Sequence, residues 1–476
     1  MNGKESRPLC VDLDGTLIRT DLLAESVFAL LKRNILFVFM FPLWLFKGKA
    51  RLKHEIAARV DIDVGLLPYH SEFLDYLKEQ HNNGRRLILA TASNEKFAEA
   101  IALNLAIFED VLASNASVNL SGSCKLRRLQ EIFGDGGFDY AGNAMVDVAL
   151  WESAAEAILV NPERGVQAAA ERNSTVMQVF DETKGSRRKQ YLKALRIHQW
   201  LKNLLVFIPL VLAHRFGEPL LLGQALLAFL SFSLCASSVY LLNDLLDLPD
   251  DRQHPTKRDR PFAAGSISVK NGAALIPGLL LASFGLALFL PVEFIGVLLL
   301  YYVMTVAYSL KLKRAVIVDV LMLASLYTLR IIAGAAAISV VLSFWLLAFS
   351  MFLFLSLALV KRYTEVLIMQ RQERNRSFGR GYATVDLETL SQFGSTSAYM
   401  AVLVLALYIN SEEVRTLYTH PHVIWLLCPL LLYMVMRIWL MARRDKVHED
   451  PVVFVIQDRR SQWLAVIGAI LLWLAI

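Results

Sequence analysis

The sequence predicts an α/β domain followed by an all-α membrane bundle of about nine transmembrane helices. Residues 1–195 alternate short apolar runs with charged helical stretches, whereas residues 196–476 consist mostly of long uncharged runs such as 331–360. Hydrophobic residues make up 55% of the chain and charged residues 19%. This composition excludes a disordered or collagen-like protein and a small secreted scaffold.

The apolar runs predict both the spans and their orientation, because about 20 apolar residues cross a bilayer as a helix. The nine predicted spans are 199–214, 220–242, 272–291, 294–310, 315–338, 343–360, 393–410, 421–441 and 461–476. Lys and Arg gather in every second loop, namely 245–270, 311–314, 361–392 and 443–460, whereas the other loops hold only Arg215 and Arg415. Because basic loops remain in the cytoplasm, we expect the N-terminus inside and the C-terminus outside.

The regions outside the spans complete the expected organisation. The first residues, MNGKESRPLCVDLDG, lack the apolar core of a signal peptide, so we expect a multi-pass protein of the inner (plasma) membrane with a cytoplasmic N-terminal domain. We place that domain at 1–182, a basic linker at 183–195 and the membrane domain at 196–476. The four cysteines lie far apart without CxxC spacing, which indicates neither a disulfide framework nor a zinc site.

Two aspartates end the first predicted strand, which covers about Pro8–Leu13. Asp12 and Asp14 are two residues apart on an extended segment and therefore point to the same side, and Gly15 permits a tight turn after them. Such a pair can hold Mg²⁺ while Asp12 attacks phosphorus and Asp14 handles the leaving-group proton. The alternative is an ordinary Asp-Gly turn after a strand.

Three later segments add groups of the same chemistry. Thr91 ends a second apolar strand, and its hydroxyl could bond a phosphoryl oxygen or cap a helix. Lys125 begins the predicted helix 125–133 and could neutralise phosphate, although a lone lysine there is more often solvated. Asn143 ends a third strand, and Asp147 follows four residues later.

In this order, these residues resemble the haloacid dehalogenase (HAD) phosphohydrolase superfamily over about residues 7–180. The resemblance implies a Rossmann-like α/β domain with a helical cap at 17–70. It also implies Asp12 as nucleophile, Asp14 as general acid/base, Thr91 and Lys125 as phosphate-binding groups, and Asp12, Asp14, Asn143 and Asp147 as the Mg²⁺ site. The fourth motif of the family is commonly GDxxxD. Here Asn143 keeps a carbonyl oxygen for a metal but removes one negative charge.

The predicted cap contains the apolar stretch 34–46, NILFVFMFPLWLF, with Lys32, Arg33 and Lys47 on its flanks. It is too short to span a bilayer. We expect a helix that lies on the bilayer surface or packs on the membrane domain. A buried core helix is the alternative.

An acidic run closes the second predicted span, where membrane helices rarely carry acids. Asp244, Asp247 and Asp251 are spaced i, i+3 and i+7 and are therefore expected on one helix face. Three like charges on one face repel one another unless cations bridge them, and oxygen ligands suit Mg²⁺. The run therefore predicts a Mg²⁺ site for a diphosphate, with a solvated helix end as the alternative.

Cations and further polar groups lie near the ends of the spans. Lys257, Arg258 and Arg260 could clamp phosphate oxygens or serve only as positive-inside charges. Asp319 and Arg330 lie inside the apolar run 315–338, where ionisable residues indicate function, although the two could instead pair as a structural bridge. The remaining candidates, which flank spans one and four, are Lys202, Asn203, Tyr308, Lys311 and Lys313.

The acid motif NDxxD at 243–247 and the number of spans resemble the UbiA-type polyprenyltransferase superfamily. The segments QWxKN at 199–203, 243–261 and LRxxAG at 329–334 are most similar to its decaprenyl-phosphate phosphoribosyltransferases. The resemblance implies phosphoribosyl diphosphate as donor, a polyprenyl phosphate as acceptor, and Mg²⁺ on Asp244, Asp247 and Asp251. The implied substrate-binding residues are Lys202, Asn203, Asn243, Lys257, Arg258, Arg260, Tyr308, Lys311, Lys313, Asp319 and Arg330. The superfamily's second acid pair, DxxxD, is absent, and extra cations near Asp319 suit substrates that carry more phosphate.

The two resemblances together predict a bifunctional membrane enzyme. The membrane domain would transfer 5-phosphoribose to the lipid phosphate, and the HAD-like domain would remove the 5′-phosphate from the product. The resemblance suggests a role in cell envelope biosynthesis. We expect no nucleic-acid partner, and a homo-oligomer is left open. The alternatives are an aromatic polyprenyltransferase that uses a prenyl diphosphate, and a lipid or ion transporter with a regulatory HAD-like domain.

Overall fold

A computed structural model describes residues 7–182, 186–371, 381–411, 414, 418–447 and 450–475. Residues 183–185 of the predicted linker, part of the third basic loop and Arg415 lie outside the described residues. Contacts divide the chain into two units. Unit 1 comprises residues 1–195 and 241–275, and unit 2 comprises residues 196–240 and 276–476.

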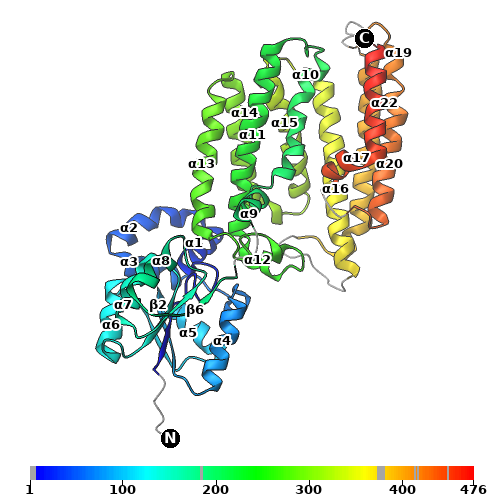
Figure 1. The fold of residues 1–476 in the computed structure, drawn as a ribbon. Coiled ribbons are helices and arrows are strands. Elements are labelled where there is room, and N and C mark those ends of the chain that lie inside the picture. Colours follow the sequence, from blue (N-terminus) through cyan, green and yellow to red (C-terminus); the bar gives the residue numbers. More distant parts are fainter. Residues whose placement is uncertain are drawn as a thin grey trace. The chain divides into compact units, whose positions relative to one another are not determined.

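Unit 1 is built on a parallel sheet of six strands in the order β3-β2-β1-β4-β5-β6 (Figure 1). The strands are β1 (Leu9–Val11), β2 (Leu87–Asn94), β3 (Asp110–Ser114), β4 (Asp139–Gly142), β5 (Ala157–Val160) and β6 (Val176–Phe180). Leu9 and Val11 face one apolar cluster and Cys10 faces another, so both faces of the central strand are buried. The chain reverses its strand order beside β1, which makes the carboxyl end of β1 the expected position of a ligand site.

Helices connect the strands of this sheet and cover it. They are α4 (Ser71–Asn82), α5 (Glu95–Leu105), α6 (Ser123–Phe133), η3 (Met145–Asp147), α7 (Val148–Ser153) and α8 (Val166–Asn173), with α9 (Arg187–Ala194) after the last strand. Asn94 caps α5 by accepting a hydrogen bond from the backbone N–H of Lys96, so the polar end of β2 also starts the next helix.

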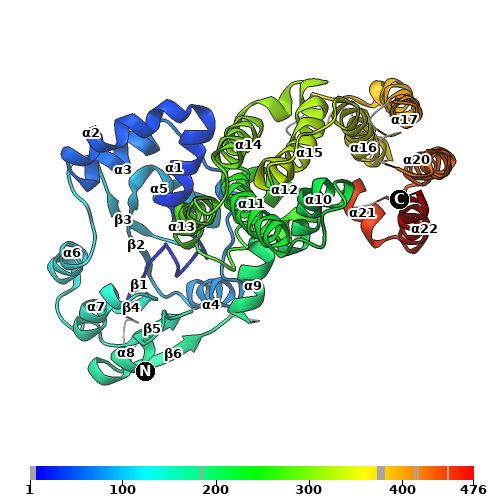
Figure 2. The same ribbon diagram turned by 90° about the horizontal axis from the view of Figure 1, so that it is seen from above.

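A helical insertion follows β1 and lies beside the sheet (Figure 2). Its elements are α1 (Leu22–Arg33), η1 (Ile35–Phe39), α2 (Met40–Phe46), α3 (Lys49–Ala57) and η2 (Val64–Leu66). Trp44 packs with Leu30 and Ile56 inside the insertion. The other large apolar side chains of 35–46 are mostly exposed, from 39% at Met40 to 90% at Phe46. The alternative of a buried core helix is therefore wrong, whereas contact with a bilayer or with the membrane domain stays a prediction.

The second part of unit 1, residues 241–275, joins two long helices. It holds the end of α11 (Pro219–Leu246), then α12 (Leu248–Gln253) and η5 (Lys257–Asp259), and the start of α13 (Val269–Ala287). Asp247 is the N-cap of α12, and Pro249 stands in the first turn of that helix. Proline has no backbone N–H and is tolerated in the first turn of a helix but not in its interior, which accounts for the break between α11 and α12.

Unit 2 is a bundle of helices (Figure 1). Besides most of α11 and α13, it contains η4 (Ile197–Phe207), α10 (Ile208–Leu212), α14 (Val292–Leu310), η6 (Leu312–Arg314), α15 (Val318–Ala337), α16 (Phe344–Arg371), η7 (Thr384–Asp386), α17 (Leu387–Ile409), α19 (Pro421–Ile424), α20 (Leu427–Arg443), α21 (Pro451–Gln457) and α22 (Arg459–Ala475). Its two main apolar clusters pack α16 against α15 and α20, and α14 against α11 and α15.

Within the described residues, seven helices are long and apolar enough to cross a membrane, or up to eight if a bent helix pair at 187–212 is one span. The protein is therefore a multi-pass membrane protein, and the predicted number of nine spans is approximate. The first predicted span, 199–214, consists of η4 and α10, and the last predicted span coincides with α22, which has only 17 residues. Helix α16 continues to Arg371, so Lys361 and Arg362 lie on a helix and not in the predicted loop 361–392.

Candidate functional site

The HAD-like centre lies at the carboxyl ends of β1, β2 and β4. Asp12 follows β1, and its Oδ1 accepts a hydrogen bond from the Lys125 Nζ at 2.6 Å. The same ammonium donates to the Tyr140 hydroxyl at 3.0 Å, and its side chain is only 5% exposed. Lys125 is therefore not the solvated helix residue of the alternative reading. A buried cation beside a carboxylate can attract a phosphate to that carboxylate.

The second aspartate of the turn is held by two donors. The Ser93 hydroxyl donates to Asp14 Oδ2 at 2.6 Å, and the backbone N–H of Leu22 donates to Oδ1 at 2.8 Å. Burial, with a smaller contribution from Asp21, raises the pKa of Asp14 to about 7. A carboxyl group that titrates near neutral pH suits proton transfer. Thr91 is buried and accepts from the backbone N–H of Ser93 at 3.0 Å, so Ser93 supplies the hydroxyl nearest to the acid.

The fourth-motif residues lie over the same turn. Gly15 has a φ of +82°, and a Cβ on it would meet Asn143 Nδ2 at 2.4 Å, so the amide of Asn143 lies directly against this turn. Asp147 Oδ2 accepts the backbone N–H groups of Asn143 (3.1 Å) and Ala144 (3.0 Å). Burial, and then the charge of Asp12, raises the pKa of Asp147 to about 6. Asp147 thus orders the loop that carries Asn143.

The acidic segment does not present the single helix face expected from its spacing, because the helix breaks at Asp247. Instead, the Arg260 Nη1 donates to Asp244 Oδ1 at 3.1 Å and to Asp251 Oδ2 at 2.7 Å. The exposed fractions of Asp244 and Asp251 are 2% and 3%. Asp247 instead forms an ion pair with Lys32 of α1, whose Nζ lies 3.1 Å from Asp247 Oδ1. Two buried carboxylates therefore converge on one positive charge.

The remaining candidates of this segment lie around that cluster. Asn243 and Lys257 are half-buried, and Arg258 is exposed in η5. Burial raises the pKa of Asp251 despite the nearby Arg260. Of the three predicted cations, the structure therefore brings Arg260 directly to the acids.

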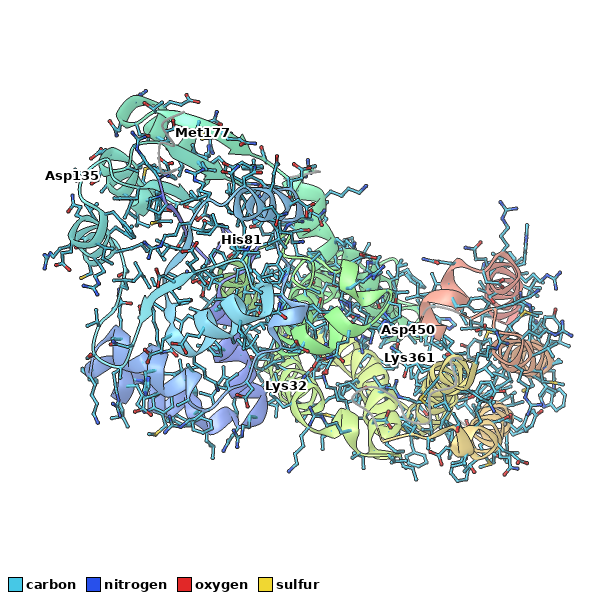
Figure 3. All side chains as sticks on the ribbon, turned by 90° about the horizontal axis from the view of Figure 1, so that it is seen from below. Lys32, His81, Asp135, Met177, Lys361 and Asp450 are labelled. Carbon is cyan, nitrogen blue, oxygen red and sulfur yellow. The ribbon has the colours of Figure 1, made fainter. Side chains whose placement is uncertain are left out.

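Unit 2 contains a second charged cluster, centred on Asp450. Its Oδ2 lies 2.7 Å from the Lys202 Nζ and 3.0 Å from the Lys361 Nζ (Figure 3). The Tyr327 hydroxyl donates to Oδ1 at 2.8 Å. The Asp450 side chain is 7% exposed and that of Lys202 is 9% exposed. Despite its burial, the two ammonium groups hold the pKa of Asp450 well below its usual range.

Asp319 and Arg330 do not form the structural bridge that was the alternative reading. Asp319 is fully buried and pairs with the guanidinium of Arg362, and its Oδ1 accepts from the Tyr382 hydroxyl at 2.6 Å. The same guanidinium donates to the Tyr308 hydroxyl at 2.9 Å. Ion pairing with Arg362 therefore accounts for the acid at position 319.

Arg330 is bound by a different set of groups. Its Nε donates to Asn203 Oδ1 at 2.9 Å, and its Nη2 donates to the Tyr301 hydroxyl at 3.3 Å. Lys311, the N-cap of η6, is exposed, and Lys313 of η6 is half-buried. The structure thus brings Lys202, Asn203, Tyr308, Asp319 and Arg330 into buried polar clusters, and leaves the two lysines of η6 near solvent.

Sequence reasoning missed several polar residues of these clusters, among them Ser93, Lys361, Arg362 and Asp450. A signal existed for two of them. The apolar residues after Arg362 continue the helical pattern of α16. Asp450 precedes Pro451 as the N-cap of α21, accepting from the backbone N–H of Val452 at 3.2 Å. The capping pattern identifies a helix start, but not the lysines that the same carboxylate holds.

The donor atoms at both acidic centres suit Mg²⁺. Asp12 follows β1, Asn143 follows β4 and lies against the turn at Gly15, and both offer oxygen ligands; Asp244 and Asp251 already enclose a positive charge, that of Arg260. The described residues contain no group of three or more Asp, Glu, His or Cys side chains arranged to hold a metal. Mg²⁺ is commonly held by one or two carboxylates together with substrate phosphates and water, so these pairs fit a metal that binds with its substrate.

Comparison with known proteins identifies both parts of the chain. Residues 204–474 match the model of the UbiA prenyltransferase family. The chain belongs to the UbiA prenyltransferase family. Residues 9–152 match the haloacid dehalogenase-like hydrolase model, which confirms the expected class of the N-terminal domain. Together with the spanning helices, the matches confirm the predicted fold class of an α/β HAD-like domain and a helical membrane bundle.

Several relatives share all or part of this UbiA-family chain. An uncharacterised protein, y4nM, of Sinorhizobium fredii is 36% identical over 98% of this chain and 89% of its own length. Nodulation protein NoeC of Azorhizobium caulinodans is 32% identical over 57% of this chain and 88% of its own length. Decaprenyl-phosphate phosphoribosyltransferase of Mycobacterium tuberculosis is 36% identical over 38% of this chain and 61% of its own length.

Proposed function

We propose that this UbiA-family protein transfers 5-phosphoribose from phosphoribosyl diphosphate to a polyprenyl phosphate, and that its HAD-like domain dephosphorylates the lipid-linked product. The first reaction is suggested by the similarity to decaprenyl-phosphate phosphoribosyltransferase of Mycobacterium tuberculosis, which covers part of both chains. The second is suggested by the match to the hydrolase model and by the pairing of Asp12 with Lys125.

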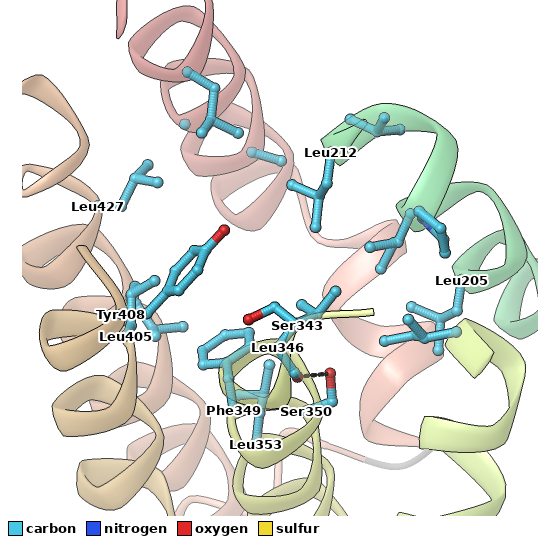
Figure 4. A pocket seen from close by; sticks show the side chains of 18 of the residues that line it. Leu205, Leu212, Ser343, Leu346, Phe349, Ser350, Leu353, Leu405, Tyr408 and Leu427 are labelled. Atoms are coloured by element: carbon cyan, nitrogen blue, oxygen red, sulfur yellow. Dashed lines mark hydrogen bonds between the residues drawn. The ribbon is translucent and has the colours of Figure 1, made fainter. Parts of the chain in front are cut away.

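An apolar cavity with one wall residue packed against the Asp450 cluster carries the proposal. The cavity in unit 2 has a volume of about 1080 Å³, and its lining includes Leu205, Leu346, Phe349 and Leu353 (Figure 4). Phe354 also lines it and stacks on Tyr327 with ring centroids 5.2 Å apart.

The hydroxyl of Tyr327 donates in turn to Asp450, which holds Lys202 and Lys361. Two ammonium groups on one carboxylate leave a net positive charge in the cluster that Tyr327 joins to Phe354 of the cavity wall. A polyprenyl phosphate has the complementary form, with an apolar chain and an anionic head.

The acidic segment supplies the donor side of the proposed reaction. Asp244 and Asp251 would hold Mg²⁺ on the diphosphate, and Arg260, which now bridges them, would contact its oxygens; Asn243, Lys257 and Arg258 would add further donors. Mg²⁺ supplies neutralisation of charge on the leaving diphosphate when bound. The bond between ribose C1 and the diphosphate oxygen breaks, and an oxygen of the lipid phosphate forms the new bond to C1. Charge stabilisation and alignment drive this step without a protein nucleophile.

The HAD-like centre would act on the 5′-phosphate of the product. Asp12 attacks phosphorus, and Lys125 neutralises the phosphoryl oxygens. Asp14 first protonates the leaving ribose oxygen and then takes a proton from the water that hydrolyses the aspartyl phosphate. Tethering the two activities in one chain raises the effective concentration of the product at the second site. On this proposal, residues 1–182 lie in the cytoplasm, and the bundle lies in the inner membrane.

The test uses detergent-purified full-length protein with Mg²⁺, polyprenyl phosphate and ribose-labelled phosphoribosyl diphosphate, followed by chromatography of the lipid phase. Wild type and Asp12→Asn are compared. Label in the lipid supports the transferase, and a phosphate retained on the ribose only in the variant supports two consecutive activities. If no label enters the lipid while the same preparation consumes a prenyl diphosphate and an aromatic acceptor, the aromatic prenyltransferase alternative replaces the proposal. Substrate flux into vesicles without turnover would instead favour the transporter.

A further inference from the structure

Four ion pairs join the helical insertion of the HAD-like domain to segment 241–275, which carries the acidic run. Both parts belong to unit 1. Glu25 of α1 pairs with Arg252, Lys32 at the end of α1 contacts Asp247 and Asp250, and Lys270 pairs with Asp21, the N-cap of α1. The first turn and the last turn of one HAD-like helix are therefore both tied to the acidic segment.

The Glu25–Arg252 pair is the most buried of the four. Glu25 and Arg252 are each 6% exposed. The guanidinium forms two hydrogen bonds with the carboxylate, from Nη1 to Oε2 at 2.9 Å and from Nη2 to Oε1 at 2.5 Å. Thr20 donates to the same carboxylate, and Arg252 Nε donates to the Ala263 carbonyl at 3.2 Å. A bidentate and buried pair with its remaining groups satisfied holds one relative position of its two elements.

The residues tied by α1 adjoin the acids of the proposed donor site. Arg252 directly follows Asp251, and Asp247 is the N-cap of α12. Lys32 Nζ lies 3.1 Å from Asp247 and 2.7 Å from Asp250, so α1 contacts α12 at its beginning through Lys32 and near its end through Glu25. Nothing in the HAD-like chemistry uses Glu25 or Lys32.

We infer that helix α1 of the HAD-like domain positions the acidic segment of the transferase, with Glu25 and Lys32 as positioning residues. The inference rests on the proposed function for its effect on catalysis. The HAD-like domain would then serve the first reaction as well as the second. It would fix α12, which carries Asp251, in the arrangement that receives the donor diphosphate. Its own nucleophile is not needed for this role.

The test compares full-length wild type, Glu25→Gln, Glu25→Asp and the exchanged pair Glu25→Arg/Arg252→Glu in detergent. Glu55→Gln is the matched control, because Glu55 also pairs with arginines of the insertion, but at the surface of α3. Two quantities are measured: hydrogen exchange of residues 243–261, and the KM and kcat of ribosyl transfer. We expect Glu25→Gln to accelerate hydrogen exchange in this segment and to raise the donor KM at least about tenfold. Residues that orient the ligands of a metal without touching it have effects of this size on metal affinity. Glu25→Asp and the exchanged pair should restore part of both.

The inference is overturned if Glu25→Gln matches Glu55→Gln in exchange of residues 243–261 and in donor KM. It is also overturned if Glu25→Gln lowers the amount of folded protein and the exchanged pair restores neither the hydrogen exchange of residues 243–261 nor the donor KM. The exchange measurement needs no substrate. If wild type transfers no ribosyl group, the proposed function fails, and faster exchange in Glu25→Gln still supports the positioning role.

Discussion

Replacing Asp450 with Asn tests the charged cluster of unit 2. The carboxylate lies within 3.0 Å of two ammonium groups, those of Lys202 and Lys361, and accepts from the Tyr327 hydroxyl at 2.8 Å. Asparagine keeps the shape but removes the only negative charge in that set. Removing one partner of a buried ion pair costs about 3–5 kcal/mol, because the remaining charge stays buried without compensation.

The expected result is a loss of about 3–5 kcal/mol in the free energy of unfolding, measured by denaturant titration of the purified protein. Tyr327→Phe removes one hydrogen bond from a neutral group and should cost about 1 kcal/mol. Asp445→Asn is the matched control, because Asp445 pairs with the half-exposed Arg371. A surface pair of this kind is worth about 0–1 kcal/mol.

A ligand phosphate should compensate for the lost charge at position 450. Polyprenyl phosphate is therefore expected to stabilise Asp450→Asn more than wild type, because its phosphate supplies the missing negative charge to the two lysines. Equal unfolding free energies for Asp450→Asn and Asp445→Asn would refute the reasoning, since they would mean that the cluster holds no uncompensated ammonium charge after the change.

Three further predictions concern unit 1. Burial, and then Arg19, lowers the pKa of His70 to about 4, below its ordinary value of 6.5. As the pH falls, the unfolded chain therefore binds the extra proton first, and the free energy of unfolding should fall by about 3 kcal/mol between pH 6.5 and pH 4. Unfolding curves of His70→Gln should lack this loss. Gly15→Ala should lower hydrolysis of an aryl phosphate at least about tenfold, because a positive φ costs an L-residue about 1–2 kcal/mol and the added Cβ meets Asn143 at 2.4 Å; unchanged turnover would contradict the described turn. A spin label on Phe46→Cys in lipid nanodiscs should be more accessible to oxygen than to a water-soluble nickel complex if 35–46 lies on the bilayer, whereas the control Leu103→Cys, at a site 83% exposed on α5, should show the reverse.

The HAD-like centre could be predicted closely because its residues follow buried strands. A short apolar run before Asp12 and another before Thr91 are local signals, and parallel strands bring their carboxyl ends to one edge. The role of Thr91 in phosphate binding stays a prediction, and the sequence did not single out Ser93, which lies in the same strand and whose hydroxyl donates to Asp14. Two candidate hydroxyls so close in sequence cannot be separated by pattern alone.

The polar clusters of unit 2 were predicted less completely, because their partners come from distant segments. Lys361 lies 89 residues from Asp450, and Arg362 lies 43 residues from Asp319. In the sequence, a lysine or arginine at the end of an apolar run looks like one of the basic residues that flank a membrane span on its cytoplasmic side. Only the continued helix α16 shows that Arg362 is buried and Lys361 half-buried. The break at Asp247, by contrast, follows from Pro249, which has no backbone N–H to continue helix α11, and could have been predicted.

The groups proposed for the donor and those proposed for the acceptor belong to different units. The acids proposed for the donor lie in unit 1, tied to α1, whereas the ammonium groups proposed for the acceptor phosphate lie in unit 2 around Asp450. A change at Glu25 should therefore act on the donor KM, and a change at Asp450 on the acceptor KM. Residues that share no partner contribute nearly additively, so the double variant Glu25→Gln/Asp450→Asn should show the sum of the two free-energy changes. A coupling well above about 0.5 kcal/mol would mean that the two clusters act on one ligand together.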